Sequence, residues 1–437
     1  MNNFEFYAVA FNNISLFLCL LFFSFLVHYV MFRTQVKSIF DPYFLAVISS
    51  VFCFTVVLIL VFTRNMSIHL FFSYVLTQLS FILGLYSFRE RNVHNLTRRI
   101  QPKGSKYANL IAFYFFSIIY LVCQCTIYFL KGIPLFMESR LETFSGGGGV
   151  GILGRVSDVS SVFSLYAFYL VVKIDKFRLT EVFKYLTLLL ISITFLLSGS
   201  KSSFLMVLFV FWCFIVFAKI KGDNVSFYIE FLKNNSRPIV LCGLVIVSFI
   251  IFVQSKPNDL DGNTLNPILA LSLRFIHSGD VYWYAYPNHV YLFVNGERWF
   301  SALFTDTLGL LRIINWEKLP EAIGITLKNI HHPSDILQGP NARHNIFGLV
   351  YFGFYGSILF SYILGASLSF IRNILPYLVS NNFFGGGLFT YLMCRGAVID
   401  TDPMLTITYF NNLIFIFPSL FIGYLFVKEM LTKKSNA

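Results

Sequence analysis

The chain has 437 residues, of which 57% are hydrophobic and only 12% are charged, and its formal net charge is +12. Soluble proteins carry about 25% charged residues, so this composition excludes a water-soluble fold and favours a polytopic helical membrane protein. A β-barrel is excluded as well, because its strands alternate and its apolar runs are short. We attribute the positive charge to cytoplasmic loops rather than to nucleic-acid binding.

Long apolar runs predict about eleven transmembrane helices, since about 20 apolar residues are needed to cross a bilayer. In chain order these runs cover residues 14–31, 43–63, 68–88, 107–130, 156–172, 185–198, 203–218, 238–255, 346–370, 383–400 and 405–427. We therefore expect an all-α fold in one integral membrane domain, residues 1–437. It includes one large, partly helical loop at 256–345.

The distribution of basic residues predicts the orientation of these helices. Twenty of the 33 Lys and Arg residues fall in one set of alternate loops, and seven of the others lie in the long loop. Short cytoplasmic loops are enriched in Lys and Arg, whereas long loops do not follow this rule. Without the long loop, one side thus has 20 Lys and Arg residues and the other side has six. This difference predicts that the N-terminus and the long loop lie outside and that the C-terminus lies in the cytoplasm.

Cysteine and histidine spacing gives no indication of a metal centre. All seven cysteines lie in apolar runs, so we expect neither a disulfide framework nor a cysteine metal site. His331 and His332 are adjacent and point apart, with no H-x-x-x-H partner nearby. The sequence therefore predicts no metal and no cofactor.

Two outward polar features precede the long loop. The first is residues 131–155, in which the four glycines Gly146 to Gly149 are expected to form a flexible link, and the second is a tight hairpin at residues 198–203. The hairpin carries Lys201, an outward cation that breaks the charge bias and is therefore a functional candidate. The alternative is a lysine that reaches the membrane interface. "GSKSS" is not a phosphate-binding P-loop, because the upstream glycine and the preceding strand are missing.

Within the long loop, residues 267–286 have the length of a helix that begins near Pro267. Helical periodicity places Arg274, His277, Val281 and Tyr284 on one stripe. A cation, an imidazole and an aromatic ring on one face suit a phosphate or a sugar. The alternative is an interfacial helix whose polar face meets water.

Arg343 and His344 directly precede the ninth predicted span. A helix N-terminus attracts anions, and a guanidinium can bind phosphate oxygens in pairs. His344 is then close enough to act as a general base, although it could simply bond water at the helix entry. Behind it, small residues spaced by four predict close helix packing. They are Gly353, Ser357, Ser361 and Gly365.

Arg395 lies near the outer end of the tenth predicted span, shortly before Asp400 and Asp402. It either faces the functional site or pairs with one of these aspartates. Both interpretations remain open at this point.

These groups, in this order, resemble the Wzy-type oligosaccharide repeat-unit polymerases of O-antigen and capsule assembly. The pieces that carry the resemblance are "GIPLF" with Arg140 and Arg155, "SGSKSSF", "LRFIHSGDVYWY", "HNIFGLVYFGFYG" and "RGA" at Arg395. They span most of the chain, but each is short and degenerate. Lys201 departs from the pattern, because relatives often carry arginine there.

The resemblance implies a metal-independent membrane glycosyltransferase of the GT-C type in the bacterial inner membrane. The donor would be a glycan on undecaprenyl pyrophosphate, and the acceptor a repeat unit on a second such carrier. A chain-length regulator protein and membrane lipid are the further partners that it implies. An O-antigen ligase and a polysaccharide flippase or other transporter are the alternatives. Against the transporter, the sequence shows neither inverted repeats nor broken helices.

The same resemblance suggests roles for the residues. The cations Arg155, Lys201, Arg274, Arg343 and Arg395 are expected at the outer face, where charge develops on the leaving pyrophosphate. Arg140 and Tyr284 join them in binding the substrate. His344 is the first choice for the base that deprotonates the acceptor hydroxyl, and His277 is the second. The aromatic run Tyr282, Trp283, Tyr284 and Tyr286 is expected to stack against sugars.

Overall fold

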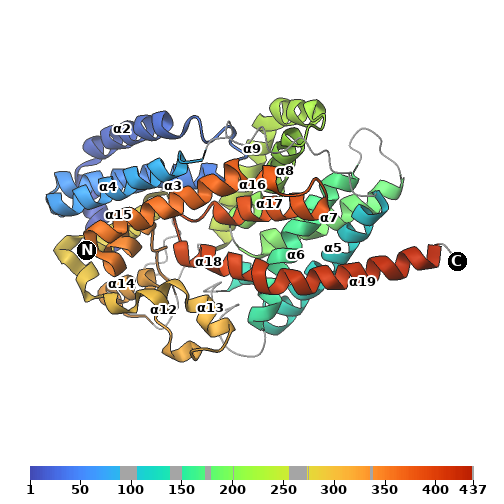
Figure 1. The fold of residues 1–437 in the computed structure, drawn as a ribbon. Helices are drawn as coiled ribbons and strands as arrows, with labels where there is room; N and C mark the ends of the chain where they lie inside the picture. Colours follow the sequence, from blue (N-terminus) through green and yellow to red (C-terminus); the bar gives the residue numbers. More distant parts are fainter. Residues whose placement is uncertain are drawn as a thin grey trace. The chain divides into compact units, whose positions relative to one another are not determined.

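The computed structural model describes residues 1–88, 106–137, 150–172, 179–199, 201–254, 273, 275–334 and 338–435. Within these ranges the regular secondary structure is helical and no β-strand occurs (Figure 1). The predicted all-α class is therefore confirmed for the described part of the chain.

The described residues group into two compact units, each assembled from stretches that are distant in sequence. Unit 1 draws on Met1–Asn92, Leu269–Ile374 and Arg395–Thr408. Unit 2 draws on Val93–Ile268, Leu375–Cys394 and Tyr409–Ala437. Where the sequence predicts one membrane domain, the structure thus has two units, and each is built from both early and late segments.

Unit 1 contains the helices α1 (Asn3–Asn12), α2 (Ile14–Phe32), α3 (Pro42–Phe62), α4 (Ile68–Leu85), α15 (His344–Asn373) and most of α18 (Pro403–Asn411). Its shorter elements are η4 (His277–Gly279), α11 (Asp280–Ala285), η5 (Pro287–Phe293), η6 (Gly296–Arg298), α12 (Trp299–Leu303), α13 (Thr305–Leu310), η7 (Trp316–Lys318) and α14 (Ile323–His331). These short elements belong to the predicted large loop, so the expectation of a partly helical loop is confirmed where the loop is described.

Unit 2 contains α5 (Lys106–Lys131), η2 (Pro134–Phe136), α6 (Val150–Val171), α7 (Leu179–Leu197), α8 (Lys201–Ile220), α9 (Ser226–Gln254), α16 (Leu375–Leu378), most of α17 (Phe383–Gly396), the π-helical turn η8 (Asn412–Ile416) and α19 (Phe417–Ser435). Aromatic rings link early and late helices in its core. Phe163 of α6 stacks on Phe116 of α5 with centroids 5.4 Å apart, and on Phe417 of α19 at 4.7 Å.

Seven helical stretches in the described residues are long and apolar enough to cross a bilayer. They are Ile14–Phe32, Pro42–Phe62, Ile68–Leu85, Lys106–Phe136, Ser203–Ile220, His344–Asn373 and Pro403–Lys433. Every one of the eleven predicted spans coincides with a helix, but α6, α7, α9 and α17 do not meet this criterion. The 14 residues of α17, for example, reach about 21 Å, which is less than the thickness of the hydrocarbon core.

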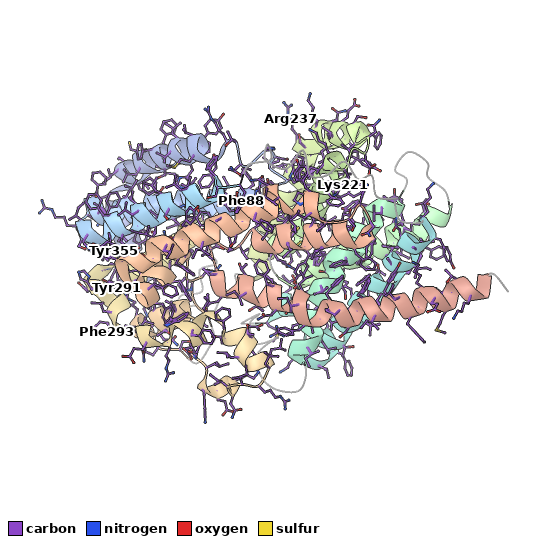
Figure 2. The ribbon with its side chains drawn as sticks, viewed as in Figure 1. Phe88, Lys221, Arg237, Tyr291, Phe293 and Tyr355 are labelled. Carbon is purple, nitrogen blue, oxygen red and sulfur yellow. The ribbon has the colours of Figure 1, made fainter. Side chains whose placement is uncertain are left out.

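Large apolar side chains cover the outside of these stretches, as expected of surfaces that face lipid. Phe129 of α5 and Leu83 of α4 are exposed, and so are Leu359 and Tyr355 of α15. Tyr355, labelled in Figure 2, is 83% exposed. A water-soluble monomer rarely exposes apolar surface on this scale, so the side chains support the membrane character that composition predicts.

Local signals explain where the helices of unit 1 begin. Asp41 caps α3 by accepting a bond from the N–H of Tyr43, and Pro42 occupies the first turn, where no N–H is needed. Ser67 caps α4 through the N–H of Leu70. The ion pair between Asp41 and Arg372, at 2.6 Å, then joins the start of α3 to the end of α15.

Two glycines allow α4 and α15 to touch backbone to backbone. A Cβ on Gly365 would collide with the carbonyl oxygen of Phe81, and a Cβ on Gly84 would collide with that of Tyr362. Close approach of this kind is characteristic of small residues between membrane helices. The predicted packing role is therefore confirmed for Gly365.

The helix α15 is broken at Gly353, where the backbone has φ 65° and ψ −170°. Its first arm, residues 344–352, folds back against its second arm, residues 354–373. Nδ1 of His344 lies 2.9 Å from Oγ of Ser361, although 17 residues of straight helix would separate them by about 25 Å. The prediction of one uninterrupted span at 346–370 is thus wrong, because Gly353 reverses the chain.

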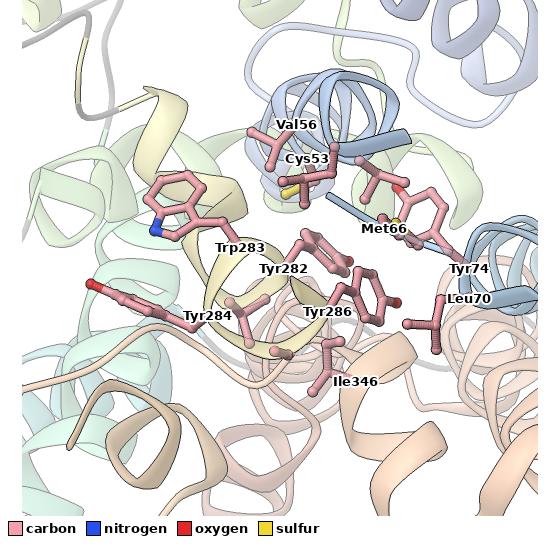
Figure 3. Close-up of a cluster of buried hydrophobic side chains, with 14 of the residues drawn as sticks. Cys53, Val56, Met66, Leu70, Tyr74, Tyr282, Trp283, Tyr284, Tyr286 and Ile346 are labelled. Carbon is pink, nitrogen blue, oxygen red and sulfur yellow. The ribbon is translucent and has the colours of Figure 1, made fainter. Parts of the chain in front are cut away.

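The aromatic run of the large loop lies in the core of unit 1 (Figure 3). Tyr282, Trp283, Tyr284 and Tyr286 are all buried, and Tyr282 meets the ring of Tyr74 edge to face at 5.2 Å. The expectation that these rings form an open platform for sugars is therefore wrong in this structure. They belong instead to a buried cluster with residues of α1, α3 and α4, in which Trp283 stacks on Phe6 of α1.

Candidate functional site

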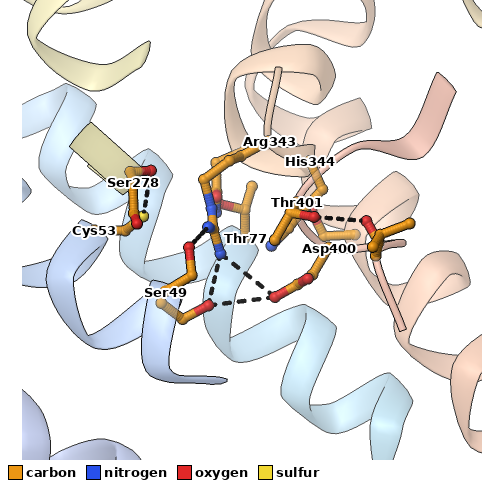
Figure 4. A network of polar contacts seen from close by, with 12 residues as sticks. Ser49, Cys53, Thr77, Ser278, Arg343, His344, Asp400 and Thr401 are labelled. Carbon is orange, nitrogen blue, oxygen red and sulfur yellow. Dashed lines mark hydrogen bonds and ion pairs between the residues drawn. The ribbon is translucent and has the colours of Figure 1, made fainter. Parts of the chain in front are cut away.

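The first arm of α15 carries Arg343 and His344 into the interior of unit 1 (Figure 4). The guanidinium of Arg343 donates to Oγ of Ser49 at 3.0 Å and to Oγ of Ser50 at 2.6 Å. It also forms an ion pair with Oδ2 of Asp400 at 3.4 Å. Arg343 is 2% exposed, so this pair is enclosed by protein.

This ion pair does not lie at the end of the membrane helices. Ser50 is eight residues into α3, or about 12 Å from its start, and the helix continues for twelve residues beyond it. The structure thus buries Arg343 beside the middle of α3, and the location of Arg343 at the outer face stays a prediction. Charges at such depth are costly and occur mainly where they pair, so the position is a functional candidate.

His344, the first choice for the base, is fully buried beside this pair. Its Nδ1 shares a hydrogen bond with Ser361, and its ring stacks on Phe81 with centroids 4.9 Å apart. Its Nε2 has no hydrogen-bond partner among the described residues. The ring nitrogen could accept a proton, but an acceptor sugar has no route to it while the arm is closed.

A second group of ionisable side chains lies nearer the surface of unit 1. Nε2 of His277 is 2.5 Å from the hydroxyl of Tyr7 on α1, and Nδ1 is 3.8 Å from Oδ2 of Asp280. The His277 side chain is 27% exposed. When the Tyr7 hydroxyl donates to Nε2, the ring proton resides on Nδ1, where it faces the carboxylate.

A hydroxyl, an imidazole and a carboxylate in this order can move a proton. The imidazole takes the proton of the hydroxyl, and the carboxylate orients the ring and stabilises the imidazolium. The sequence indicated His277 as a candidate base, but it gave no indication of Tyr7. No local pattern links Tyr7 to a histidine 270 residues away.

The predicted stripe around His277 is divided by the fold. Val281 and Tyr284 are buried, and the Tyr284 hydroxyl donates to Oδ1 of Asn3 at 2.7 Å. Burial raises the pKa of Tyr284 to about 12, so the hydroxyl remains a neutral donor near neutral pH. Tyr284 therefore links α11 to α1 and does not face a substrate or water. Arg274, the remaining residue of the stripe, lies outside the described residues.

α3 connects the two groups of unit 1. Ser49 binds the guanidinium of Arg343, and one turn later Cys53 donates its thiol to the carbonyl oxygen of Ser278, at 2.9 Å. Ser278 directly follows His277. One turn of α3 thus fixes both the buried ion pair and the segment that carries the more exposed histidine.

Unit 2 contains a separate polar network around α6. Arg155 donates to Oδ1 of Asn412 at 2.8 Å, and the amide of Asn412 donates to Oδ2 of Asp158 at 3.0 Å. The Tyr391 hydroxyl also donates to Asp158. Asn412 opens the π-helical turn η8, and such turns are frequent at functional sites. The spacing of Arg155 and Asp158, three residues apart on one helix, could have indicated this network.

The remaining predicted residues receive less support from the geometry. Lys201 is the first residue of α8, and Arg395 lies in the last turn of α17. The Lys201 side chain and Arg140 fall outside the described part of the chain. Asp400, one of the two aspartates considered for Arg395, pairs with Arg343.

Unit 1 therefore brings Arg343 together with His344, and His277 together with Asp280. Comparisons with known proteins give no match: no family model fits the sequence, and no curated protein or solved structure is significantly similar. The geometry of these side chains and the resemblance described above are therefore the only indications of function.

Proposed function

We propose that the protein is a membrane-embedded glycosyltransferase that polymerises lipid-linked oligosaccharides, with eleven spans and a GT-C-like architecture. A glycan on undecaprenyl pyrophosphate is the donor, and a repeat unit on a second carrier is the acceptor. The reaction takes place at the periplasmic face of the inner membrane. The observation that carries this proposal is the partly exposed set Tyr7, His277 and Asp280, which can accept the acceptor's proton without a metal.

In the proposed reaction an acceptor hydroxyl oxygen forms a bond to the anomeric carbon of the donor. The bond from that carbon to the pyrophosphate oxygen breaks, and the pyrophosphate leaves with the electron pair. The acceptor's proton passes to the Tyr7 oxygen as Tyr7 passes its own proton to Nε2 of His277. The carboxylate of Asp280 offsets the charge that develops on the imidazole.

This assignment transfers the role of base from His344 to His277. A general base must come within about 3 Å of the hydroxyl or act through one bridging group. His277 satisfies this condition through Tyr7, whereas His344 is enclosed. Arg274, three residues before His277 in sequence, is the cation that we propose for the leaving pyrophosphate, where one such donor contributes about 3 kcal/mol.

Purified protein in nanodiscs, incubated with a synthetic repeat unit on a prenyl pyrophosphate, tests the proposal. We expect a ladder of longer glycans and release of the prenyl pyrophosphate, without added metal or nucleotide. His277→Ala should abolish the ladder while the variant remains folded. Transfer to lipid A core without a ladder would instead identify a ligase, and no transfer to either acceptor would refute the proposal.

One observation favours a transporter as the second candidate. Transporters use helices that are broken near the membrane midplane and that place ionisable groups there. Gly353 breaks α15, and the re-entrant arm carries Arg343 to its partner Asp400 inside unit 1. The expectation that broken helices are absent is therefore wrong. Uptake of a lipid-linked oligosaccharide across proteoliposomes, with no new glycosidic bond, would favour this function.

A further inference from the structure

The large loop of unit 1 carries exposed apolar side chains that no membrane-spanning stretch includes. Four of them lie close together in sequence: Leu292 and Phe293 at the end of η5, and Trp299 and Phe300 at the start of α12. Phe293 is 75% exposed. We call these four residues the loop patch. Nothing in the proposed reaction uses it, and water is an unfavourable environment for such a surface.

Contacts fix the position of the loop patch relative to the membrane helices. A Cβ on Gly296, between the two halves of the patch, would lie 2.7 Å from the carbonyl oxygen of Val350. The Trp299 ring packs on Phe352 with centroids 5.6 Å apart. Val350 and Phe352 directly precede the turn at Gly353, so the patch lies beside the hairpin end of α15.

The lipid-facing surface of α15 begins at the same place. Tyr355 and Leu359 are exposed on the second arm within two turns of Gly353. Figure 2 shows Tyr355 and Phe293 along the same edge of unit 1, with Tyr291 labelled between them. The exposed apolar side chains of the second arm thus begin just after Val350 and Phe352, the residues that the loop patch contacts.

We propose that the loop patch is embedded in the bilayer interface, beside the hairpin end of α15, with lipid as its occupant. Tryptophan, tyrosine and phenylalanine side chains favour this zone, where rings meet acyl chains and polar edges meet headgroups. The exposed charges between the two halves are Glu297 and Arg298, which cancel. Insertion therefore depends on apolar burial and not on anionic lipid.

Tryptophan fluorescence in nanodiscs tests the inference on the full chain. The fluorescence of Trp299 is obtained as the difference between the unsubstituted protein and the Trp299→Phe variant. We expect lipids brominated near the headgroup to quench it more strongly than lipids brominated near the bilayer centre, and iodide in the water to leave it unquenched. The Trp283 component, obtained with Trp283→Phe, is the matched control, because its ring is buried against Phe6 and neither quencher should reach it.

Phe293→Trp provides a second, independent reporter, since it adds a tryptophan at the most exposed position of the patch. Its added signal should show the same preference for shallow bromines, at low and at high salt. Quenching by iodide but not by brominated lipid would place the patch in water and overturn the inference. Protection from both quenchers would show that protein covers the patch, for example a second copy, and would overturn it equally.

Discussion

His344 and Ser361 lie 17 positions apart in α15, yet Nδ1 of one is 2.9 Å from Oγ of the other. This hydrogen bond closes the helical hairpin whose turn is Gly353. Farther along the hairpin, a Cβ on Gly348 would lie 2.9 Å from that of Ser357. The location of Arg343 therefore depends on the backbone of a single glycine.

Gly353→Ala should destabilise unit 1 by about 1–3 kcal/mol, because φ 65° with ψ −170° is a conformation that only glycine adopts at low cost. A Cβ there would meet open space, so the cost comes from the backbone and not from a clash. Thermal unfolding in nanodiscs measures the effect. Gly243→Ala in α9 is the matched control, since its Cβ is also unobstructed and its φ is ordinary. Equal stability of the two variants would show that the turn does not need glycine.

Asp400→Asn should cost about 3–5 kcal/mol of stability, because it leaves the buried guanidinium of Arg343 without a counter-charge. The double variant Arg343→Met with Asp400→Leu should recover most of this loss, since it removes both charges together. Denaturation of the purified variants measures both effects.

The exposed ion pair between Lys433 and Glu429 provides the control for this experiment. Glu429→Gln should leave stability unchanged, because solvent screens that pair. If Asp400→Asn were as stable as Glu429→Gln, the pair with Arg343 would not hold the re-entrant arm in place.

Much of the helical structure was predictable from sequence because apolar runs are a local signal. All eleven predicted runs overlap helices, although only seven stretches among the described residues satisfy the length and apolarity of a span. The break in α15 was not predictable in this way, because residues 346–370 are mostly apolar and contain no charged residue and no proline. Gly353 also belongs to a four-residue ridge of small residues, a pattern typical of packing in a straight helix.

The candidate site was predictable only in part, for a similar reason. His277 stood out because ionisable residues are rare in this chain, and Arg343 because it precedes a span. The sequence of Tyr282 and Trp283 is compatible with a sugar platform and equally with a core, and only tertiary contacts distinguish the two. The partner Tyr7 comes from an N-terminal helix whose docking onto the loop has no local signature.

The predicted orientation can be tested with reporter fusions. Alkaline phosphatase, which is active only outside the cytoplasm, should be active after Leu310 and inactive after Gly222. Leu310 belongs to the large loop, whereas Gly222 lies in the turn after α8, next to Lys221 and close to Lys219 in the last turn of that helix. A cytoplasmic fluorescence reporter at the same two sites should give the opposite result. The reverse pattern would place Tyr7 and His277 on the cytoplasmic side.

His331 should make the loop less stable in acid. Its Nε2 lies 2.9 Å from the carbonyl oxygen of Tyr284, and partial burial lowers its pKa below the ordinary value. The folded loop therefore binds protons less readily than the unfolded loop. The stability is fully present above about pH 6.5 and is lost as the pH falls through the folded pKa.

Hydrogen exchange of α14, corrected for the intrinsic pH effect, should accordingly be faster at pH 5 than at pH 7.5. His331→Gln places an amide N–H near the position of Nε2, where it can donate to Tyr284, but does not titrate, so its exchange should not show this additional acceleration. An equal acceleration in the variant would assign the effect to another group.

Tyr7→Phe should slow glycan polymerisation by about 10²–10⁴, because it removes the hydroxyl that passes a proton to His277 and keeps the ring. His277→Ala should cause a loss of similar size, and the double variant should be scarcely slower than either single variant, since the two groups act as a unit. The KM for the lipid-linked acceptor should change little. His344→Gln is the decisive comparison, because an amide can form a hydrogen bond but cannot accept a proton. If the proton relay runs through Tyr7, this variant retains its rate. A folded His344→Gln protein that loses its rate, beside a Tyr7→Phe protein that keeps it, would assign the base to His344 and require the re-entrant arm to open during turnover.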